Sequence, residues 1–236
     1  MKVEIWSDIA CPFCYIGKAH YEEALSQFKH SSKVETIYRS YLISPDIQFD
    51  ENETVVTMLM AKKGMSETHV KQMLSQVEQM ASEANVKINF STNKPANTLN
   101  AHRLLQFAYS VNKTESVLNA LFKAHFELGE NIQDTNVLIS LAVNCGIDKL
   151  VLESLFTSDN FLYEVKQDIL YANNIGVKGV PFFLFNNKYT ISGAQPTSVF
   201  TEVLNKVYEE WSGSMNDKIS VSEQSNLSCD NDKCDI

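Results

Sequence analysis

The order of hydrophobic and polar positions near the start of the chain reads as a strand, a helix and a second strand. Residues 2–7 form a short β-rich run, and residues 33–43 alternate between apolar and polar positions. Between them, residues 14–30 carry apolar side chains at near-helical spacing. This succession predicts a βαβ unit, in which the two strands are parallel and the crossover is right-handed.

The pattern becomes helical over residues 53–174. Several of these segments open with Ser, Thr, Asn or Asp, the residues that cap helix N-termini. His125 lies inside one of them and reads as an ordinary helix residue. The predicted helical segments are 54–64, 66–85, 97–112, 114–129, 134–146 and 158–176.

β character returns at residues 180–193, where two apolar runs flank Asn186 and Asn187, which is typical of a hairpin. Residues 196–211 then predict a helix. Strands at both ends and helices in the middle predict an α/β core that carries an all-helical insertion. Residues 212–236 are serine-rich, acidic and free of aromatic side chains, so we expect a flexible tail.

The composition narrows the class of protein. The chain has 236 residues, of which 44% are hydrophobic and 21% charged, as in globular proteins with a sizeable core. The formal net charge is −9, from 20 Lys and Arg against 29 Asp and Glu, and no basic block stands out, so we expect no nucleic-acid partner. No apolar run is long enough to cross a membrane, and the N-terminus does not read as a signal peptide. We therefore expect a cytoplasmic protein without a membrane partner.

The chain contains a pair of cysteines two residues apart, within the sequence "DIACPFCYIGKAH". A structural disulfide is disfavoured in a reducing compartment, where paired cysteines are more often catalytic, redox-sensing or metal-binding. A structural zinc site needs four ligands, and no second CxxC and no HxxxH follows, so we expect no metal. The five cysteines are Cys11, Cys14, Cys145, Cys229 and Cys234.

A redox role fits the position of the pair between a strand and a helix. Cys11 would lie at the helix N-terminus, where unpaired N–H groups and the helix dipole favour a thiolate and lower the thiol pKa. Pro12 suits the first helical turn because it has no N–H and its φ is fixed. Cys14, about one turn into the helix, would be shielded and placed to resolve a mixed disulfide.

A second feature lies far away in the sequence, at Val180 and Pro181, where the later β run begins. Proline is awkward inside a strand, and a cis X–Pro bond is rare and usually has a purpose. With a CxxC after the first strand, we expect a cis bond whose loop faces the cysteines and exposes the Val180 backbone to a substrate chain. The alternative is an ordinary trans proline that opens an edge strand.

Other residues near these motifs are candidates for shaping the site. Asp8 precedes the first cysteine by three positions, and it could move protons or, as we favour, accept hydrogen bonds from backbone N–H groups of the loop. His102 is a candidate for shaping the cleft, whereas Arg103 reads as a structural ion-pair partner. Pro12 and Phe13, between the cysteines, are expected to tune the redox potential.

Taken together, the motifs "SDIACPFCYIG", "NTLNAHRLLQFA", "LFKAHFELGENI" and "GVKGVPFFLFNNKYTISGAQP" resemble the DsbA-like class of thioredoxin-fold proteins, in its FrnE-type branch. The resemblance covers residues 1–211. It implies a thioredoxin fold interrupted by a helical domain, dithiol–disulfide chemistry and a cis-proline. The implied division is a thioredoxin-fold part at 1–50, a helical insertion at 51–165, a second thioredoxin-fold part at 166–211, and a flexible tail at 212–236.

The tail contains the pair Cys229 and Cys234. Some FrnE-type proteins carry a second cysteine pair near the C-terminus, so the resemblance implies electron exchange between this pair and the CxxC. A flexible tether gives such a pair a high effective concentration at the first one. The alternative is two exposed thiols that bind adventitious metal or have no role.

The resemblance implies a thiol–disulfide oxidoreductase that acts on thiol- or disulfide-containing proteins and is recycled by a reductant. It requires no cofactor beyond the cysteines, although glutathione stays open. One alternative is a glutathione-dependent isomerase or transferase, as in 2-hydroxychromene-2-carboxylate isomerases and kappa-class glutathione transferases, which typically have serine in place of Cys11. The other is a redox-regulated chaperone. The sequence does not settle the substrate, the direction of electron flow, the recycling partner or the oligomeric state.

Overall fold

The computed structural model describes residues 1–47 and 49–224, with side chains described up to residue 213 in the last helix. In this part of the chain a four-stranded mixed sheet has the order β2-β1-β3-β4. β1 pairs with β2 in parallel, whereas β3 is antiparallel to both β1 and β4. The parallel pair confirms the predicted βαβ unit. The strands are β1 (Lys2–Ser7), β2 (Glu35–Ser40), β3 (Phe182–Phe185) and β4 (Tyr189–Ser192).

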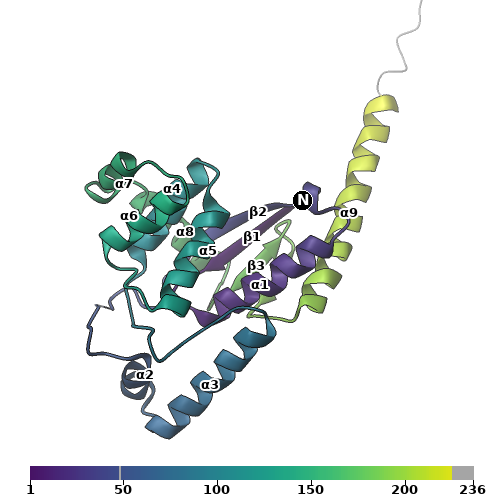
Figure 1. Ribbon diagram of the computed structural model, residues 1–236. Coiled ribbons are helices and arrows are strands. Elements are labelled where there is room, and N and C mark those ends of the chain that lie inside the picture. The colour runs from purple at the N-terminus through teal and green to yellow at the C-terminus, as the bar shows by residue number, and fades with distance from the viewer. Residues whose placement is uncertain (48, 225–236) are drawn as a thin grey trace, which may run out of the picture.

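Helices surround the sheet and fill the long segment between β2 and β3 (Figure 1). α2 and α3 lie together at one end of the molecule, and α4 to α8 gather beside the sheet (Figure 1). The helices are α1 (Pro12–Gln27), α2 (Val55–Lys63), α3 (Glu67–Glu83), α4 (Leu99–Ser110), α5 (Thr114–Phe122), α6 (Thr135–Asn144), α7 (Lys149–Phe156), α8 (Leu162–Asn174) and α9 (Thr197–Gln224), with a 3-10 turn η1 (Ser31–Lys33) and a π-helix η2 (Lys123–Leu128).

The two faces of the sheet are covered by different helices because side chains alternate along each strand. Val3 and Ile5 of β1 pack with residues of α1 and α9, whereas Trp6 packs on the opposite face with Ala172 of α8. A further apolar cluster joins the start of α1 to the helices between β2 and β3. The start of α1 therefore lies where the sheet domain meets the helical segment.

Three local features differ from or add to the sequence prediction. α7 is a helix that the sequence periodicity does not reveal, because it is only eight residues long. α9 continues to Gln224, so the predicted helix end at residue 211 is wrong. Once a helix is formed, each added residue gains a hydrogen bond, and the single Gly213 costs only about 1 kcal/mol. The implied boundary between residues 165 and 166 falls inside α8.

The predicted hairpin is present between β3 and β4. Asn186 and Asn187 both have positive φ, and the N–H of Lys188 donates to the carbonyl of Phe185. Asparagine tolerates this left-handed conformation better than most residues, which explains why the pair marks the turn.

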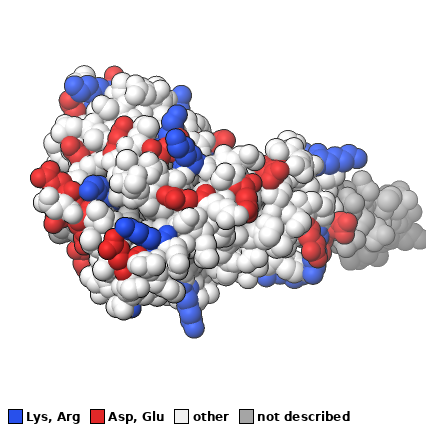
Figure 2. Space-filling view, turned by 60° about the horizontal axis from the view of Figure 1, so that its bottom comes forward, with Lys and Arg blue, Asp and Glu red and all other residues white. Residues whose placement is uncertain are grey.

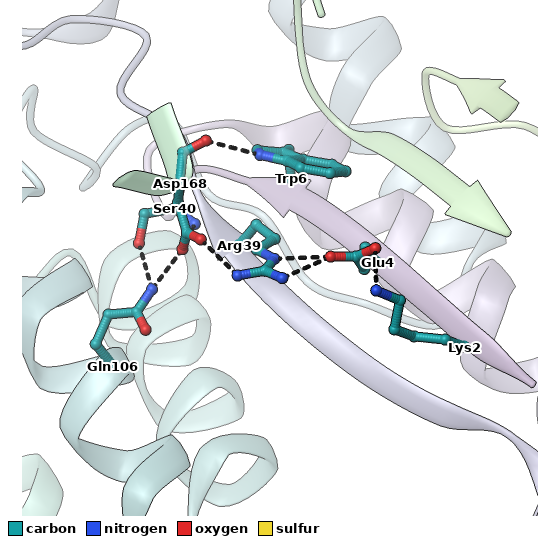
Figure 3. A network of polar contacts seen from close by, with 7 residues as sticks. All are labelled: Lys2, Glu4, Trp6, Arg39, Ser40, Gln106 and Asp168. Atoms are coloured by element: carbon teal, nitrogen blue, oxygen red, sulfur yellow. Dashed lines mark hydrogen bonds and ion pairs between the residues drawn. The ribbon is translucent and has the colours of Figure 1, made fainter. Parts of the chain in front are cut away.

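A buried polar network ties the sheet to α4 and α8 (Figure 3). Asp168 of α8 is 4% exposed, and its carboxylate lies 2.9 Å from Arg39 Nη1. It also accepts hydrogen bonds from the Ser40 N–H at 2.9 Å and from Gln106 Nε2 at 2.5 Å. A buried carboxylate needs such partners, because an unpaired charge in the interior is strongly destabilising.

The same arginine reaches a second buried carboxylate on β1 (Figure 3). Glu4 is fully buried, and its oxygens lie 2.6 Å from Arg39 Nη2 and 2.7 Å from Lys2 Nζ. Burial alone would raise the pKa of Glu4, but the two cations outweigh it and lower that pKa. On the face drawn in Figure 2, acidic and basic side chains are interspersed, and the described lysines and arginines form no continuous basic surface.

Candidate active site at the start of α1

The two cysteines of the CxxC lie at the N-terminus of α1. Cys11 is the residue that caps the helix, and Pro12 occupies the first turn. The carbonyl of Cys11 accepts the N–H of Cys14 at 3.0 Å, so the second cysteine is held one turn further on. Cys11 is 6% exposed, Cys14 is 1% exposed, and both are free thiols. The helix N-terminus thus presents its positive dipole end to Cys11.

Cys14 lies deeper than Cys11 and is held as a thiol. Burial raises its pKa well above the ordinary value, and the neighbouring Cys11 thiol raises it further. The backbone N–H of Asp8 donates to Cys14 Sγ at 3.5 Å, which opposes this effect without cancelling it. The raised pKa of Cys14 favours its protonated, thiol form.

The loop before β3 faces these cysteines. The Val180–Pro181 peptide bond is cis, the isomer that the sequence predicts. The Cys11 thiol donates to the Val180 carbonyl at 3.6 Å, although the two residues are 169 positions apart. Gly17 of α1 permits this approach, because a Cβ there would lie 3.0 Å from Pro181 Cγ. The fold therefore brings Val180 and Pro181 against the CxxC.

Asp8 is buried beneath the loop that carries the cysteines. Its Oδ1 accepts the Ala10 N–H at 3.2 Å and the Thr98 hydroxyl at 2.7 Å, and its Oδ2 accepts the Ile43 N–H at 2.7 Å. His102 Nε2 lies 3.4 Å from Oδ1. Burial alone would raise the pKa of Asp8, but His102 and the other donors outweigh it and lower that pKa. Asp8 thus accepts backbone hydrogen bonds, as the favoured sequence interpretation holds, and it also joins α4 to the site.

A cavity of about 320 Å³ opens beside Cys11. Pro12 and Phe13 line it from the start of α1, and Phe13 is 39% exposed. Most of the remaining wall is apolar and comes from helices between β2 and β3. The principal side chains are Met58 and Leu59 of α2, Met73 and Leu74 of α3, Phe90, and Phe126 of η2.

His125 is a residue of this cavity that sequence reasoning missed. It lines the cavity, is 2% exposed, and its Nδ1 has no hydrogen-bond partner. Burial lowers its pKa to about 4, against a smaller opposing effect of the Asp8 charge. The sequence pattern that could have identified His125 is a polar residue within an apolar helical stretch, next to Phe126. That pattern alone does not separate a site residue from a buried core histidine.

Other predicted residues have structural positions or lie outside the described part. Arg103 is not the ion-pair partner that the sequence suggests: in the described residues it donates to the carbonyls of Leu155, Ser158 and Asn160 and to the side chain of Asn100. It therefore holds a loop through neutral acceptors.

The predicted second pair, Cys229 and Cys234, lies outside the described residues. Within the described residues, no group of three or more His, Cys, Asp or Glu side chains is placed to hold a metal ion.

The sheet order and the dithiol at the start of α1 define the class of the protein as a thioredoxin-fold oxidoreductase. Residues 2–205 match the family described as the DSBA-like thioredoxin domain, and the chain belongs to that family. The match spans both halves of the sheet and the helices between them.

Similarity to individual proteins agrees with this assignment. The structure is similar to a probable DsbA oxidoreductase of Streptomyces coelicolor (SCO1869), with 34% identity, a TM-score of 0.84, and coverage of 89% of this chain and 91% of that one. The sequence is 27% identical over 208 residues to the uncharacterized protein YwbO of Bacillus subtilis (strain 168), covering 86% of this chain and 96% of that protein. The cytosolic disulfide reductase DsbM of Pseudomonas aeruginosa shares the fold, with 13% identity, a TM-score of 0.62, and coverage of 89% and 100%.

Within residues 1–47 and 49–224, every helix is too short or too polar to cross a membrane.

Proposed function

We propose that the protein catalyses thiol–disulfide exchange on protein substrates, with Cys11 as the attacking cysteine and Cys14 as the resolving one. The observation that carries the proposal is the pair of free thiols at the N-terminus of α1, with Cys11 Sγ 3.6 Å from the Val180 carbonyl. Backbone groups beside a reactive sulfur can pair with an extended substrate chain. Val180 and Pro181 would hold the substrate, and the CxxC would exchange electrons with it.

In the reductive direction, the Cys11 thiolate attacks one sulfur of a substrate disulfide. The substrate S–S bond breaks, one substrate thiolate leaves, and a mixed disulfide forms on Cys11. Cys14 then gives up its proton and attacks Cys11 Sγ, which releases the second substrate sulfur as a thiolate. The substrate gains two electrons, and the Cys11–Cys14 pair becomes a disulfide.

In the oxidative direction, the same steps run backwards. A substrate thiolate attacks Cys11 of the Cys11–Cys14 disulfide, and Cys14 leaves and takes up a proton. A second substrate thiolate then attacks the substrate sulfur of the mixed disulfide, and Cys11 leaves as a thiolate. The helix N-terminus stabilises this leaving thiolate, because its unpaired N–H groups and dipole favour negative charge.

The finer identity of the protein belongs to the same proposal. We assign it to the FrnE-type branch, working in the cytoplasm without a cofactor other than its cysteines. The Cys229–Cys234 pair would exchange electrons with the CxxC. DsbM is named as a cytosolic disulfide reductase and its structure was solved with GSH, so glutathione is the first recycling reductant to test here.

Two assays test the proposal: reduction of insulin disulfides with dithiothreitol, and oxidative refolding of a reduced, unfolded test protein. Wild type is expected to exceed the blank in at least one, and the assay with the greater activity gives the direction of electron flow. Cys11→Ser is expected to fall to the blank. Cys145→Ser, which removes a half-buried thiol at the end of α6, is the matched control and is expected to keep full activity.

The tail is tested with the double variant Cys229→Ser/Cys234→Ser. A lower turnover with an intact CxxC would support electron exchange between the two pairs, and unchanged turnover would remove the tail from the mechanism. Wild-type activity no greater than the blank in both assays would refute the proposed function. Turnover of small electrophiles with glutathione would then be the next activity to measure.

A further inference from the structure

The sulfur of Cys14 depends on a few donors to become a thiolate. Cys14 is 1% exposed, and burial raises the pKa of its thiol well above the ordinary value. The backbone N–H of Asp8, which donates to Cys14 Sγ at 3.5 Å, and the side chain of Ser7 both lower that pKa. Because the thiolate is the form of cysteine that attacks a disulfide, these contacts affect how readily Cys14 resolves a mixed disulfide.

The Asp8 N–H is held in place through the side chain of the same residue. The Asp8 carboxylate is buried and accepts the N–H groups of Ala10 and Ile43, at 3.2 and 2.7 Å. Both of these donors belong to loops. A further bond comes from the hydroxyl of Thr98, which donates to Asp8 Oδ1 at 2.7 Å. Thr98 is 3% exposed and lies at the start of α4, so its bond ties Asp8 to a helix.

The side chain of Thr98 serves this contact and not its own helix. A threonine at a helix N-cap usually accepts a hydrogen bond from an N–H of the first turn. Thr98 is the N-cap of α4, but its side chain makes no such bond. His102 follows four positions later, on the same side of the helix, and its Nε2 lies 3.4 Å from Asp8 Oδ1. The start of α4 therefore presents two side chains to Asp8, within the segment "NTLNAHRL".

We infer that Thr98 is a positioning residue for the resolving step of the exchange reaction. Its hydroxyl fixes the Asp8 carboxylate, and the fixed carboxylate keeps the Asp8 N–H directed at Cys14 Sγ. In that step the proton of Cys14 passes to solvent, and the thiolate attacks Cys11 Sγ of the mixed disulfide. The Cys11–Cys14 bond forms, and the substrate sulfur leaves with the electron pair of the bond that breaks. The inference rests on the proposed function and adds a residue of the helical segment to it.

The titratable groups around this contact are not altered when Thr98 is replaced. Cys11 raises the pKa of Cys14 through a hydrogen bond and its charge. Asp8 carries the N–H donor, and His102 from α4 lowers the pKa of its carboxyl group. His125 of η2 has a pKa of about 4, because it is buried. A threonine side chain does not titrate, so its replacement by valine adds and removes no ionisable group.

Single-turnover kinetics separate the two chemical steps. The chromogenic disulfide dithiobis(nitrobenzoic acid) releases one coloured thiolate when Cys11 attacks it and a second one when Cys14 resolves the mixed disulfide. The full chain is used in its reduced form and carries Cys145→Ser, Cys229→Ser and Cys234→Ser, so that only the CxxC reacts. Both releases are followed over a range of pH.

Thr98→Val is expected to slow the second release about tenfold, the effect of weakening one hydrogen bond to a charged sulfur. The pH midpoint of that release is expected to rise, because the pKa of Cys14 rises, and the first release is expected to keep its rate. Thr98→Ser retains the hydroxyl and is expected to restore both the rate and the midpoint. Slowing of both releases alike, or no recovery in Thr98→Ser, would overturn the inference.

Thr36→Val is the matched control, because it removes a hydroxyl that is bonded to the Tyr21 hydroxyl at 2.7 Å. Tyr21 lies about two turns further along α1 than Cys14. The control is expected to leave both releases unchanged. A slower second release in Thr36→Val, as large as that in Thr98→Val, would show a general loss of packing and would contradict the inference.

A titration without any exchange reaction separates failure of the inference from failure of the proposed function. When Cys11→Ser is added to the same protein, Cys14 is the remaining thiol, and its ionisation is followed by the ultraviolet absorbance of the thiolate and by the NMR shift of the Asp8 amide proton. Thr98→Val is expected to raise the pKa of Cys14 and to reduce the change in the Asp8 shift. An unchanged pKa in a protein that exchanges disulfides would overturn the inference alone. A raised pKa, in a protein whose wild type shows no exchange, would support the contact and refute the proposed function.

Discussion

Replacing His125 with leucine is expected to stabilise the protein, and more strongly at acidic pH. In the folded state His125 is 2% exposed, its Nδ1 has no partner, and burial lowers its pKa to about 4. In an unfolded chain the pKa of histidine is about 6.5. Between these two values the unfolded state binds a proton that the folded state does not, so the wild type loses stability as the pH falls.

The magnitude follows from the two pKa values. Lowering the pH from 7 to 5 protonates the unfolded histidine almost fully and the folded one hardly at all. The linked loss of folding free energy is about 2 kcal/mol. At pH 7 this linked effect is small. Removing the unpaired nitrogen is then expected to raise the free energy of unfolding by about 1–3 kcal/mol. Loss of the edge contact with Phe126, whose ring centre lies 4.7 Å away, offsets about 0.5–1 kcal/mol of that gain.

Urea titrations of wild type and His125→Leu at pH 7 and pH 5 measure the effect. The difference in unfolding free energy between the two proteins is expected to grow by about 2 kcal/mol at the lower pH. His69→Leu, which replaces an exposed histidine on α3, is the control for the loss of a histidine that is not buried. A pH-independent difference for His125→Leu would refute the reasoning, because it would mean that His125 titrates alike in the folded and unfolded states.

Two further predictions concern the packing that supports the site. Asp168→Leu leaves Arg39 without one of its buried partners and is expected to lower the unfolding free energy measured in urea titrations by about 3–5 kcal/mol. Glu164→Ala, a change at an exposed position on the same helix, is the control and is expected to lower it by less than about 0.5 kcal/mol. Equal effects of the two variants would contradict this prediction. Gly17→Ala places a Cβ 3.0 Å from Pro181 Cγ, so it is expected to slow insulin reduction at least about tenfold while the protein stays folded by circular dichroism. Full activity would show that the proline loop tolerates displacement.

Much of the candidate site can be read from the sequence because it depends on neighbours in the chain. The spacing of Cys11 and Cys14, and their place between a strand and a helix, fix one cysteine at the helix end and the other one turn inside. The turn at Asn186 and Asn187 is likewise set by the local conformational preferences of two residues. The cis bond before Pro181 was expected from its position at the start of a β run combined with the distant CxxC.

Contacts across long sequence separations were not readable in the same way. Asp8 and His102 are 94 positions apart, and nothing in the local pattern of either residue selects the other. Arg103 illustrates the failure: its charge suggests an acidic partner, but the fold offers it backbone carbonyls, which are equally able to accept its hydrogen bonds.

The sequence alone therefore determined the order of the strands, the helical segment inside an α/β fold, and the place of the dithiol at the start of a helix, since each depends on periodicity, capping or spacing over a few residues. Only the tertiary structure decided that α2 and α3 leave a cavity beside Cys11 and that His125 lines it without a partner. The physical reason is that a cavity is what packing leaves unfilled. Its shape depends on how helices distant in sequence meet, and no single segment carries that information.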